Sequence, residues 1–169
     1  MEKVDIYDVN KNRTGKVKTR GIDTLEEGEY VVIARCAIIN NKKEILITKR
    51  SRNKKKHPSL WEIPGGHISS GETSEKGLER EIKEEVGIDI SEKEKYLINS
   101  FIIKNKINDV WICRLSVGIE SMRFMDNEVE DARFVRIDEY KKMHKNKELI
   151  RYESFSEKEY NDAIKILFK

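Results

Sequence analysis

Cysteine, proline and long apolar runs are scarce in this 169-residue chain, which has two cysteines and two prolines. Two cysteines without a Cys-x-x-Cys pattern exclude a disulfide-rich scaffold. Cys36 and Cys113 both lie in apolar stretches, so we expect reduced thiols in the core. No stretch approaches the length of a membrane span, and the first residues form no apolar signal region. These absences predict a cytoplasmic protein with no membrane partner.

An excess of one charge is also missing. The chain has 34 Lys and Arg against 31 Asp and Glu, so its formal net charge is only +3. A charge this small does not predict nucleic-acid binding. Charged residues make up 38% and hydrophobic residues 37%, and the hydrophobic residues are gathered in blocks. The length and the blocks predict one folded domain with a heavily charged surface.

The blocks predict a mixed α/β domain in which helices cover a sheet. Strands are expected at residues 30–39, 44–49, 96–104, 109–117 and 132–137, with a short hairpin from 4–7 and 15–19. Helices are expected at residues 73–86, 138–144 and 156–168. Residues 105–108 are expected to separate two of the strands as a loop.

The helix at residues 73–86 has the clearest pattern. Its apolar residues Leu78, Ile82 and Val86 recur at helical spacing, and Gly87 is placed to end it. Gly77 inside the helix costs about 1 kcal/mol relative to alanine. We therefore expect another backbone to approach the helix closely at Gly77.

Acidic residues share one face of the same helix. Glu81, Glu84 and Glu85 are spaced i, i+3 and i+4, so their carboxylates are neighbours and repel one another. A cation would remove this repulsion, and hard oxygen donors suit Mg²⁺ or Mn²⁺. Metal sites of this kind serve phosphate chemistry. The sequence therefore predicts a divalent-metal site on this helix.

The segment around these glutamates resembles the signature of the Nudix hydrolases, G-x5-E-x7-R-E-U-x-E-E-x-G-U, where U is aliphatic. Every specified position is filled, by Gly66, Glu72, Arg80, Glu81, Ile82, Glu84, Glu85, Gly87 and Ile88. The flanking strand blocks and the last helix are similar to the MutT-like fold of that family. The resemblance implies an α/β (α+β) fold, a Nudix-type α/β/α sandwich with a mixed central sheet. It places the Nudix domain at residues 29–169, with residues 1–28 as an extension packed on it.

The resemblance also implies roles for the residues of the segment. Glu81, Glu84 and Glu85 would hold one to three Mg²⁺ or Mn²⁺ ions, together with the carbonyl of Gly65 in a tight turn. A further ligand from a later loop would be Glu128, or Glu130 beside it.

The remaining motif positions have catalytic or structural roles by the same resemblance. Glu84 and Glu81 are the expected catalytic carboxylates, one of which generates the nucleophile. Arg80 would pair with Glu72 or with a catalytic glutamate and orient it. Gly66, Glu72 and Gly87 would be structural.

More than one role is open for several residues outside the motif. Lys49 and Arg50 end a strand near the motif, where a contact to substrate phosphate and a plain surface role are both open. Trp61 and Trp111 suit core packing better than stacking on a substrate. His57, His67 and His144 are treated as structural or surface, and for His67 a contact to substrate is also open because it lies in the variable stretch of the motif. Glu75 and Glu79 have no motif role and are expected to be solvated. Substrate selectivity is expected in loops 51–57, 103–109 and 120–130.

The leading functional hypothesis is a Mg²⁺-dependent hydrolase that cleaves a diphosphate linkage in a nucleoside diphosphate derivative or related organic pyrophosphate. One alternative is an isoprenoid-diphosphate isomerase. The region before the motif in isomerase-like Nudix proteins is similar to Tyr7-Asp8, Thr14-Gly15, Arg20-Gly21 and the run from Lys49 to Trp61 here. Those isomerases have a cysteine after the tryptophan-containing strand, and residues 62–66 here have none. The other alternative is a non-catalytic nucleotide-sensing domain, although all motif glutamates are kept. A homodimer is open, because family members are often dimers.

Overall fold

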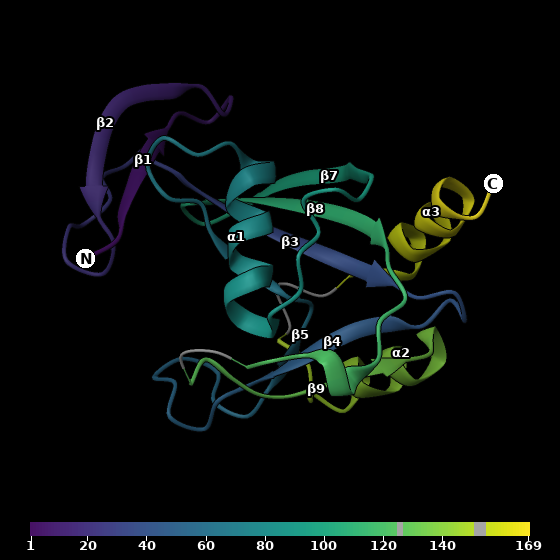
Figure 1. The fold of residues 1–169 in the computed structure, drawn as a ribbon. Helices are drawn as coiled ribbons and strands as arrows, with labels where there is room; N and C mark the ends of the chain where they lie inside the picture. The colour runs from purple at the N-terminus through teal and green to yellow at the C-terminus, as the bar shows by residue number, and fades with distance from the viewer. Residues whose placement is uncertain (125–126, 151–154) are drawn as a thin grey trace.

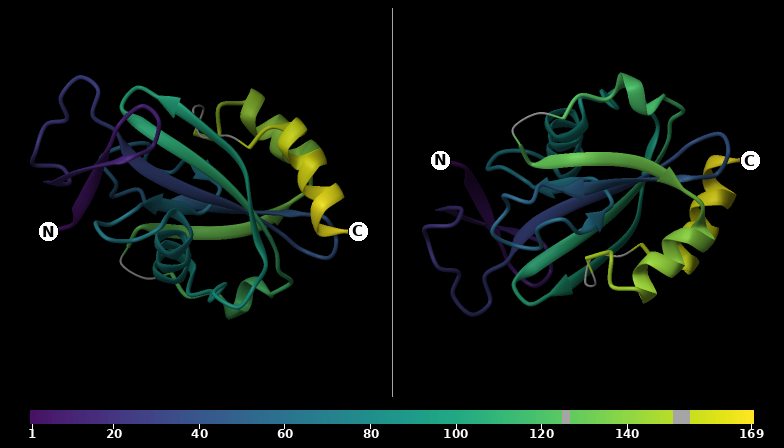
Figure 2. Two further views of the ribbon diagram at one scale, coloured as in Figure 1. Left: turned by 90° about the horizontal axis from the view of Figure 1, so that it is seen from above. Right: turned by 90° about the horizontal axis from the view of Figure 1, so that it is seen from below.

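A computed structural model describes residues 1–124, 127–150 and 155–169. The described elements are β1 (Lys3–Tyr7), β2 (Arg13–Thr19), β3 (Val31–Ile39), β4 (Ile45–Arg50), β5 (Trp61–Glu62), β6 (Gly65–His67), α1 (Ser74–Val86), β7 (Lys95–Ile103), β8 (Lys106–Arg114), the short 3₁₀ helix Ile119–Ser121, β9 (Val129–Val135), α2 (Ile137–Lys145) and α3 (Glu157–Leu167). Seven strands form a mixed sheet, with α1 on one face and α2 and α3 on the other (Figures 1 and 2). This confirms the predicted fold.

Strand β3 is the centre of the sheet, and all nine of its residues are buried. It runs parallel to β8 and antiparallel to β4 and β6, while β5 and β9 pair with β4 and β7 pairs with β8. Successive side chains of a strand point to opposite faces. Val32, Ala34 and Cys36 accordingly join the core beneath α1, whereas Ala37 and Ile39 join the core beneath α2 and α3.

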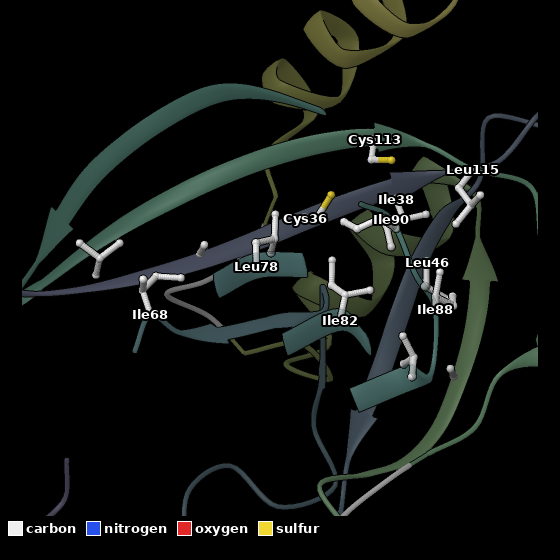
Figure 3. Packing of buried hydrophobic residues seen from close by; sticks show 14 of the residues in the cluster. Cys36, Ile38, Leu46, Ile68, Leu78, Ile82, Ile88, Ile90, Cys113 and Leu115 are labelled. Atoms are coloured by element: carbon white, nitrogen blue, oxygen red, sulfur yellow. The ribbon is translucent and has the colours of Figure 1, made fainter. Parts of the chain in front are cut away.

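The predicted apolar stripe fixes α1 to the sheet. Leu78, Ile82 and Val86 are fully buried against β3 and its neighbours. Figure 3 shows Leu78 and Ile82 in this core. Burying one such side chain contributes roughly 1.5–3 kcal/mol. Cys36 and Cys113 lie in the same core as free thiols, as predicted. The orientation of α1, and with it the direction of its glutamates, therefore follows from the stripe.

The ends of α1 also follow the sequence. Thr73 accepts a hydrogen bond from the backbone N–H of Lys76 (3.2 Å), and Gly87 closes the helix in the left-handed conformation with φ 71°. The expected close approach at Gly77 is real but comes from side chains, not from a backbone. An added Cβ there would lie 2.6 Å from Cδ1 of Ile68 and 2.9 Å from Oε2 of Glu72.

The sequence misplaces several strand boundaries. Residues 106–108 were expected in a loop, but they belong to β8 and pair with β7, so that Lys104 and Asn105 alone make the turn. Lys104 takes a positive φ of 55°, which permits this tight connection. Strand β9 begins at residue 129 rather than 132, and β5 and β6 are too short to leave a periodic pattern. Of loop 120–130, residues 125 and 126 lie outside the described part of the chain.

Strands β1 and β2 form a separate two-stranded sheet, which we call the N-terminal hairpin (residues 1–28 with their connecting turns). Tyr7 and Tyr30 exchange backbone hydrogen bonds of 2.8 and 2.9 Å with each other. The Lys11 ammonium lies 2.6 Å from the Asp109 carboxylate, which is buried in β8. The hairpin is therefore attached to the main sheet both by a backbone bridge and by an ion pair. In the described residues, no helix is both long and apolar enough to cross a membrane.

Candidate active site

The turn at Gly65 and Gly66 brings the backbone against the glutamates of α1. Gly65 donates its N–H to Oε2 of Glu85 (3.0 Å). A Cβ on Gly66 would lie 2.2 Å from Oε2 of Glu81, and a Cβ on Gly65 would lie 2.2 Å from the backbone oxygen of Ala34. Gly65 also has a φ of 147°, which side chains rarely allow. Backbone atoms thus leave no room for a side chain at Gly65, whereas a side chain at Gly66 would displace the Glu81 carboxylate.

Arg80 ties the first half of the motif to the second. Its Nε and Nη2 donate to the two carboxylate oxygens of Glu72 at 2.8 and 2.9 Å, a bidentate pair. Its Nη1 donates to Glu81 at 2.8 Å and to Glu84 at 3.0 Å. The hydrogen bonds from Arg80 lower the pKa of Glu72, and those to Glu72 and Glu81 raise the pKa of Arg80. The expected pairing of Arg80 with Glu72 is therefore present, and Arg80 also orients two of the glutamates.

Two of the glutamates are poorly solvated. The exposed fraction is 9% for Glu81 and 7% for Glu85. Burial raises the pKa of Glu81, although Arg80 opposes the shift. Burial also raises the pKa of Glu85, and the negative charges of Glu62 and Glu81 raise it further against the N–H of Gly65. A bound cation would relieve both the desolvation and the repulsion.

A cavity of about 340 Å³ collects the carboxylates. We call it the glutamate cavity, and its lining residues are Glu2, Arg20, Ser69, Arg80, Glu81, Glu84, Glu85 and Glu128. Glu128 therefore reaches the cavity from the loop before β9, and it also pairs with Lys54. Glu130 does not line it, because its carboxylate pairs with Lys49 (3.0 Å).

The donor set suits a divalent ion, since Glu81, Glu84, Glu85 and Glu128, four of the five glutamates that line the cavity, supply hard oxygen ligands. Among the described residues, no three acidic, histidine or cysteine side chains already converge as a ligand set. Arg80 explains this arrangement, because it draws Glu81 and Glu84 toward its own guanidinium. A metal ion would have to compete with Arg80 for these two carboxylates, while Glu72 retains its bidentate hold on Arg80.

A second cavity of about 730 Å³ adjoins the first and shares Arg20, Glu81, Glu85 and Glu128 with it. We call it the basic cavity, because Lys18, Arg20, Arg35, Arg50, Lys54, Lys55, Lys56 and Lys106 are among its lining residues. Arg50 thus lies in a cavity as expected of a substrate contact, and it also pairs with Glu62 (2.7 Å). Lys49 lines neither cavity.

Several cavity residues were missed by the sequence. Arg20 comes from the N-terminal hairpin, and Arg35 and Lys106 come from neighbouring strands of the sheet. Only Arg35 could have been found from the sequence, because it is the one charged residue of an otherwise apolar strand. His67 was treated as structural or surface, yet it lines the basic cavity. Burial, followed by the positive charges of Arg20, Lys106 and Arg35, lowers the pKa of His67 to about 3.

Of the other predictions about individual side chains, the one for Glu79 is wrong and those for Trp61 and Trp111 are confirmed. Glu79 was expected to be solvated, but its side chain is 10% exposed and pairs with the buried ammonium of Lys95 at 3.0 Å. That prediction is wrong because the Lys95 side chain, from the first residue of β7, reaches Glu79 and forms this ion pair. Trp61 and Trp111 pack against the two cores, as expected. The indole N–H of Trp111 donates to Ser74 (3.1 Å), next to the N-terminus of α1.

Comparison with known proteins identifies the family. Residues 29–155 match the model of the NUDIX domain, and this chain belongs to the Nudix hydrolase family. These enzymes are pyrophosphohydrolases that act on acid anhydrides and generally use divalent metal ions.

The relatives span most of the chain. An uncharacterized Nudix hydrolase of Listeria monocytogenes is 33% identical, over 90% of each chain. The isopentenyl-diphosphate Delta-isomerase of Klebsiella pneumoniae is 24% identical, over 81% of this chain and 77% of that protein. The crystal structure of DR0079 from Deinococcus radiodurans matches the fold with a TM-score of 0.70 at 20% identity, over 84% of this chain and 88% of that one.

Proposed function

We propose that this protein is a Mg²⁺- or Mn²⁺-dependent hydrolase that cleaves the diphosphate linkage of a nucleoside diphosphate derivative or related organic pyrophosphate. The observation that carries the proposal is the junction of the two cavities. One wall presents Glu81, Glu84, Glu85 and Glu128, and the adjoining space is lined by cationic side chains. A diphosphate bridged to the glutamates by divalent ions would have its remaining charge matched by the basic wall.

The residues have distinct parts in this reaction. Glu81, Glu84, Glu85 and Glu128 would hold the ions, together with the carbonyl of Gly65. The ions, when bound, neutralise the diphosphate and polarise the phosphorus–oxygen bond under attack.

Hydrolysis then adds a water oxygen to one phosphorus, while the bridging oxygen leaves with the other phosphate. A glutamate of the cluster accepts the proton of the water. Arg80, held by Glu72, would orient Glu81 and Glu84 until the ions take over these carboxylates.

The position of the thiols supports hydrolysis over isomerisation. An isoprenoid-diphosphate isomerase of the kind that the N-terminal half resembles needs a cysteine acid/base near the site. Cys36 and Cys113 are buried in the core under α1, and neither lines the glutamate cavity or the basic cavity. Burial raises the pKa of both thiols, which makes them poor proton donors in addition.

The test is turnover of a panel of nucleotides, sugar nucleotides and dinucleoside polyphosphates with Mg²⁺ or Mn²⁺. The change of Glu84→Gln should lower kcat by about 100-fold or more, the size of effect expected for a catalytic carboxylate. Glu75→Gln is the matched control, because Glu75 lies on the same helix but lines neither cavity. Absence of product from every compound, or equal rates for wild type and Glu84→Gln, would refute the proposal. Tight nucleotide binding without turnover would instead favour the sensing domain.

The cytoplasmic location, the absence of a nucleic-acid partner and the question of a homodimer stay predictions of the sequence.

A further inference from the structure

The N-terminal hairpin contributes a cation to the junction of the two cavities. Arg20 follows β2 directly and lines both the glutamate cavity and the basic cavity. Residues 1–28 precede the segment that matches the family model, which begins at residue 29. Among the residues that line both cavities, the positive charge of Arg20 therefore comes from outside the matched domain, whereas the glutamates come from within it.

The hairpin is fastened to the loop that leads into α1. The carbonyl of Lys3 accepts the N–H of Ser70 at 2.8 Å. The Asp5 carboxylate accepts the Ser70 hydroxyl at 2.6 Å and the N–H of Gly71 at 3.0 Å. Arg13 donates to the carbonyl of Glu72 in the same loop. These contacts set the hairpin, and with it Arg20, in a defined position relative to the motif.

The sheet provides further cations beside Arg20. Val31 of β3 is in register with Lys106 of β8, and paired residues of neighbouring strands project to the same face. Arg35, four residues further along β3, projects to that face too and donates to Asn108 of β8 (3.2 Å). Lys106 and Arg35 both line the basic cavity, as does Arg20.

The Arg20 side chain has a partner that a substrate could replace. Its Nη1 lies 2.5 Å from the Glu2 carboxylate, and the side chain is 47% exposed. Glu2 also lines the glutamate cavity, so this ion pair borders the space that a substrate would enter. A phosphate group there would exchange one carboxylate partner of Arg20 for a more highly charged acceptor.

Building on the proposed function, we propose that Arg20, with Lys106 and Arg35, forms a cationic subsite for an anionic terminal group of the substrate. The preferred substrates would be diphosphates with a free terminal phosphate, rather than those whose terminal phosphate is masked by a neutral group. A free terminal phosphate adds negative charge close to the glutamates. The hairpin supplies the positive charge that makes this arrangement favourable.

Binding tests the subsite independently of catalysis. The probes are α,β-methylene-ADP, whose methylene bridge resists hydrolysis, and its terminal methyl ester, each titrated with Mg²⁺ by calorimetry. Wild type should bind the free phosphate about 10-fold more tightly than the ester, the low end for a charge-assisted contact at a half-exposed site. Arg20→Ala should reduce this ratio to about 2-fold or less, and Arg20→Lys should keep most of it, since charge is the feature at issue.

Lys42→Ala is the matched control, because Lys42 is an exposed cation in the turn after β3, at the other end of that strand from the cavities. It should leave the ratio unchanged. Thermal unfolding of each variant checks that the hairpin is folded. If Arg20→Ala weakens both probes equally, or weakens neither, the subsite is refuted.

Turnover of ADP and of its terminal methyl ester separates the subsite from the proposed reaction. Hydrolysis of both, with an Arg20-dependent rise in KM for ADP alone, supports both ideas. Hydrolysis with no Arg20-dependent preference refutes the subsite and leaves the hydrolase standing. An Arg20-dependent preference in binding, without hydrolysis of any diphosphate, supports the subsite and refutes the hydrolase.

Discussion

Alanine in place of Gly65 should mainly lower the stability of the fold, whereas alanine in place of Gly66 should mainly weaken metal binding and turnover. In Gly66→Ala, the new Cβ would lie 2.2 Å from Oε2 and 2.5 Å from Cδ of Glu81, which is the far end of a flexible side chain. Glu81 can swing away, at the cost of its ion pair with Arg80, which is partly exposed. We expect a loss of about 1 kcal/mol in the free energy of unfolding. Divalent-metal binding and turnover should nevertheless fall sharply.

In Gly65→Ala, the new Cβ would collide with backbone atoms rather than with the end of a flexible side chain. Its Cβ would lie 2.2 Å from the oxygen of Ala34 and 2.7 Å from Cα of Arg35, and β3 cannot move aside because it is the centre of the sheet. The φ of 147° adds strain, since an L side chain rarely adopts it. Overpacking and backbone strain cost about 1–3 kcal/mol each, so the sum is about 2–6 kcal/mol. At this chain length, that corresponds to a fall in Tm of roughly 5 °C to well over 10 °C, against about 3 °C for Gly66→Ala.

Thermal unfolding without metal gives the stability of both variants, and titration with Mn²⁺ gives metal affinity. The reasoning is refuted if Gly66→Ala binds Mn²⁺ as wild type does. It is refuted equally if Gly65→Ala is no less stable than Gly66→Ala, because the difference between backbone and side-chain contacts would then not matter.

Three further predictions concern the ion pairs around the site. Asp109→Asn should remove the buried charge that holds Lys11 and reduce stability by about 1–2 kcal/mol, with faster hydrogen exchange in residues 3–19; unchanged exchange there would contradict the tether. The N–H of Glu26 and two lysines lower the pKa of Glu29 to about 2 from 4.5, so its stabilising contribution is complete above pH 4.5 and disappears as the pH falls through about 2. Glu29→Gln should therefore flatten the acid limb of stability in circular dichroism, and an unaltered limb would count against it. Arg80→Lys loses the bidentate geometry toward Glu72 and should lower kcat by about 10-fold or more, and Glu72→Gln should add little to it in the double variant, whereas additive losses would show independent roles.

The sequence predicted the elements of the fold that are determined by residues close together in the chain. The stripe of Leu78, Ile82 and Val86, the end at Gly87 and the apolar block of β3 each reflect a periodicity or a backbone requirement. The motif positions came from a linear spacing, and the structure brings four of the nine, Arg80, Glu81, Glu84 and Glu85, into the glutamate cavity because their spacing is helical. The resemblance to the Nudix signature also predicted that Arg80 pairs with Glu72 or with a catalytic glutamate.

The missed features depend on contacts between distant segments. The Lys11–Asp109 pair spans 98 residues, and no local pattern records it. Lys106 was placed in a loop because polar residues surround it, although its ladder with β7 and β3 decides otherwise. Arg20 was singled out only as part of the resemblance to isomerase-like Nudix proteins, and the fold of the hairpin shows that it reaches the glutamate cavity.

The placement of the glutamates on α1 links the stability of the fold to the chemistry of the site. Glu81 immediately precedes Ile82, and Glu85 immediately precedes Val86, so the apolar stripe that seats the helix also draws these carboxylates out of water. The raised pKa values of Glu81 and Glu85 reflect the free-energy cost of removing their carboxylates from water. The stripe can support this cost because its side chains are fully buried. A helix turned by one residue would return the carboxylates to solvent and separate them from Gly65 and Gly66. The same burial that anchors the helix thus prepares the cluster to gain from a cation, and the strongest binding should follow from this desolvation rather than from the number of acidic residues alone.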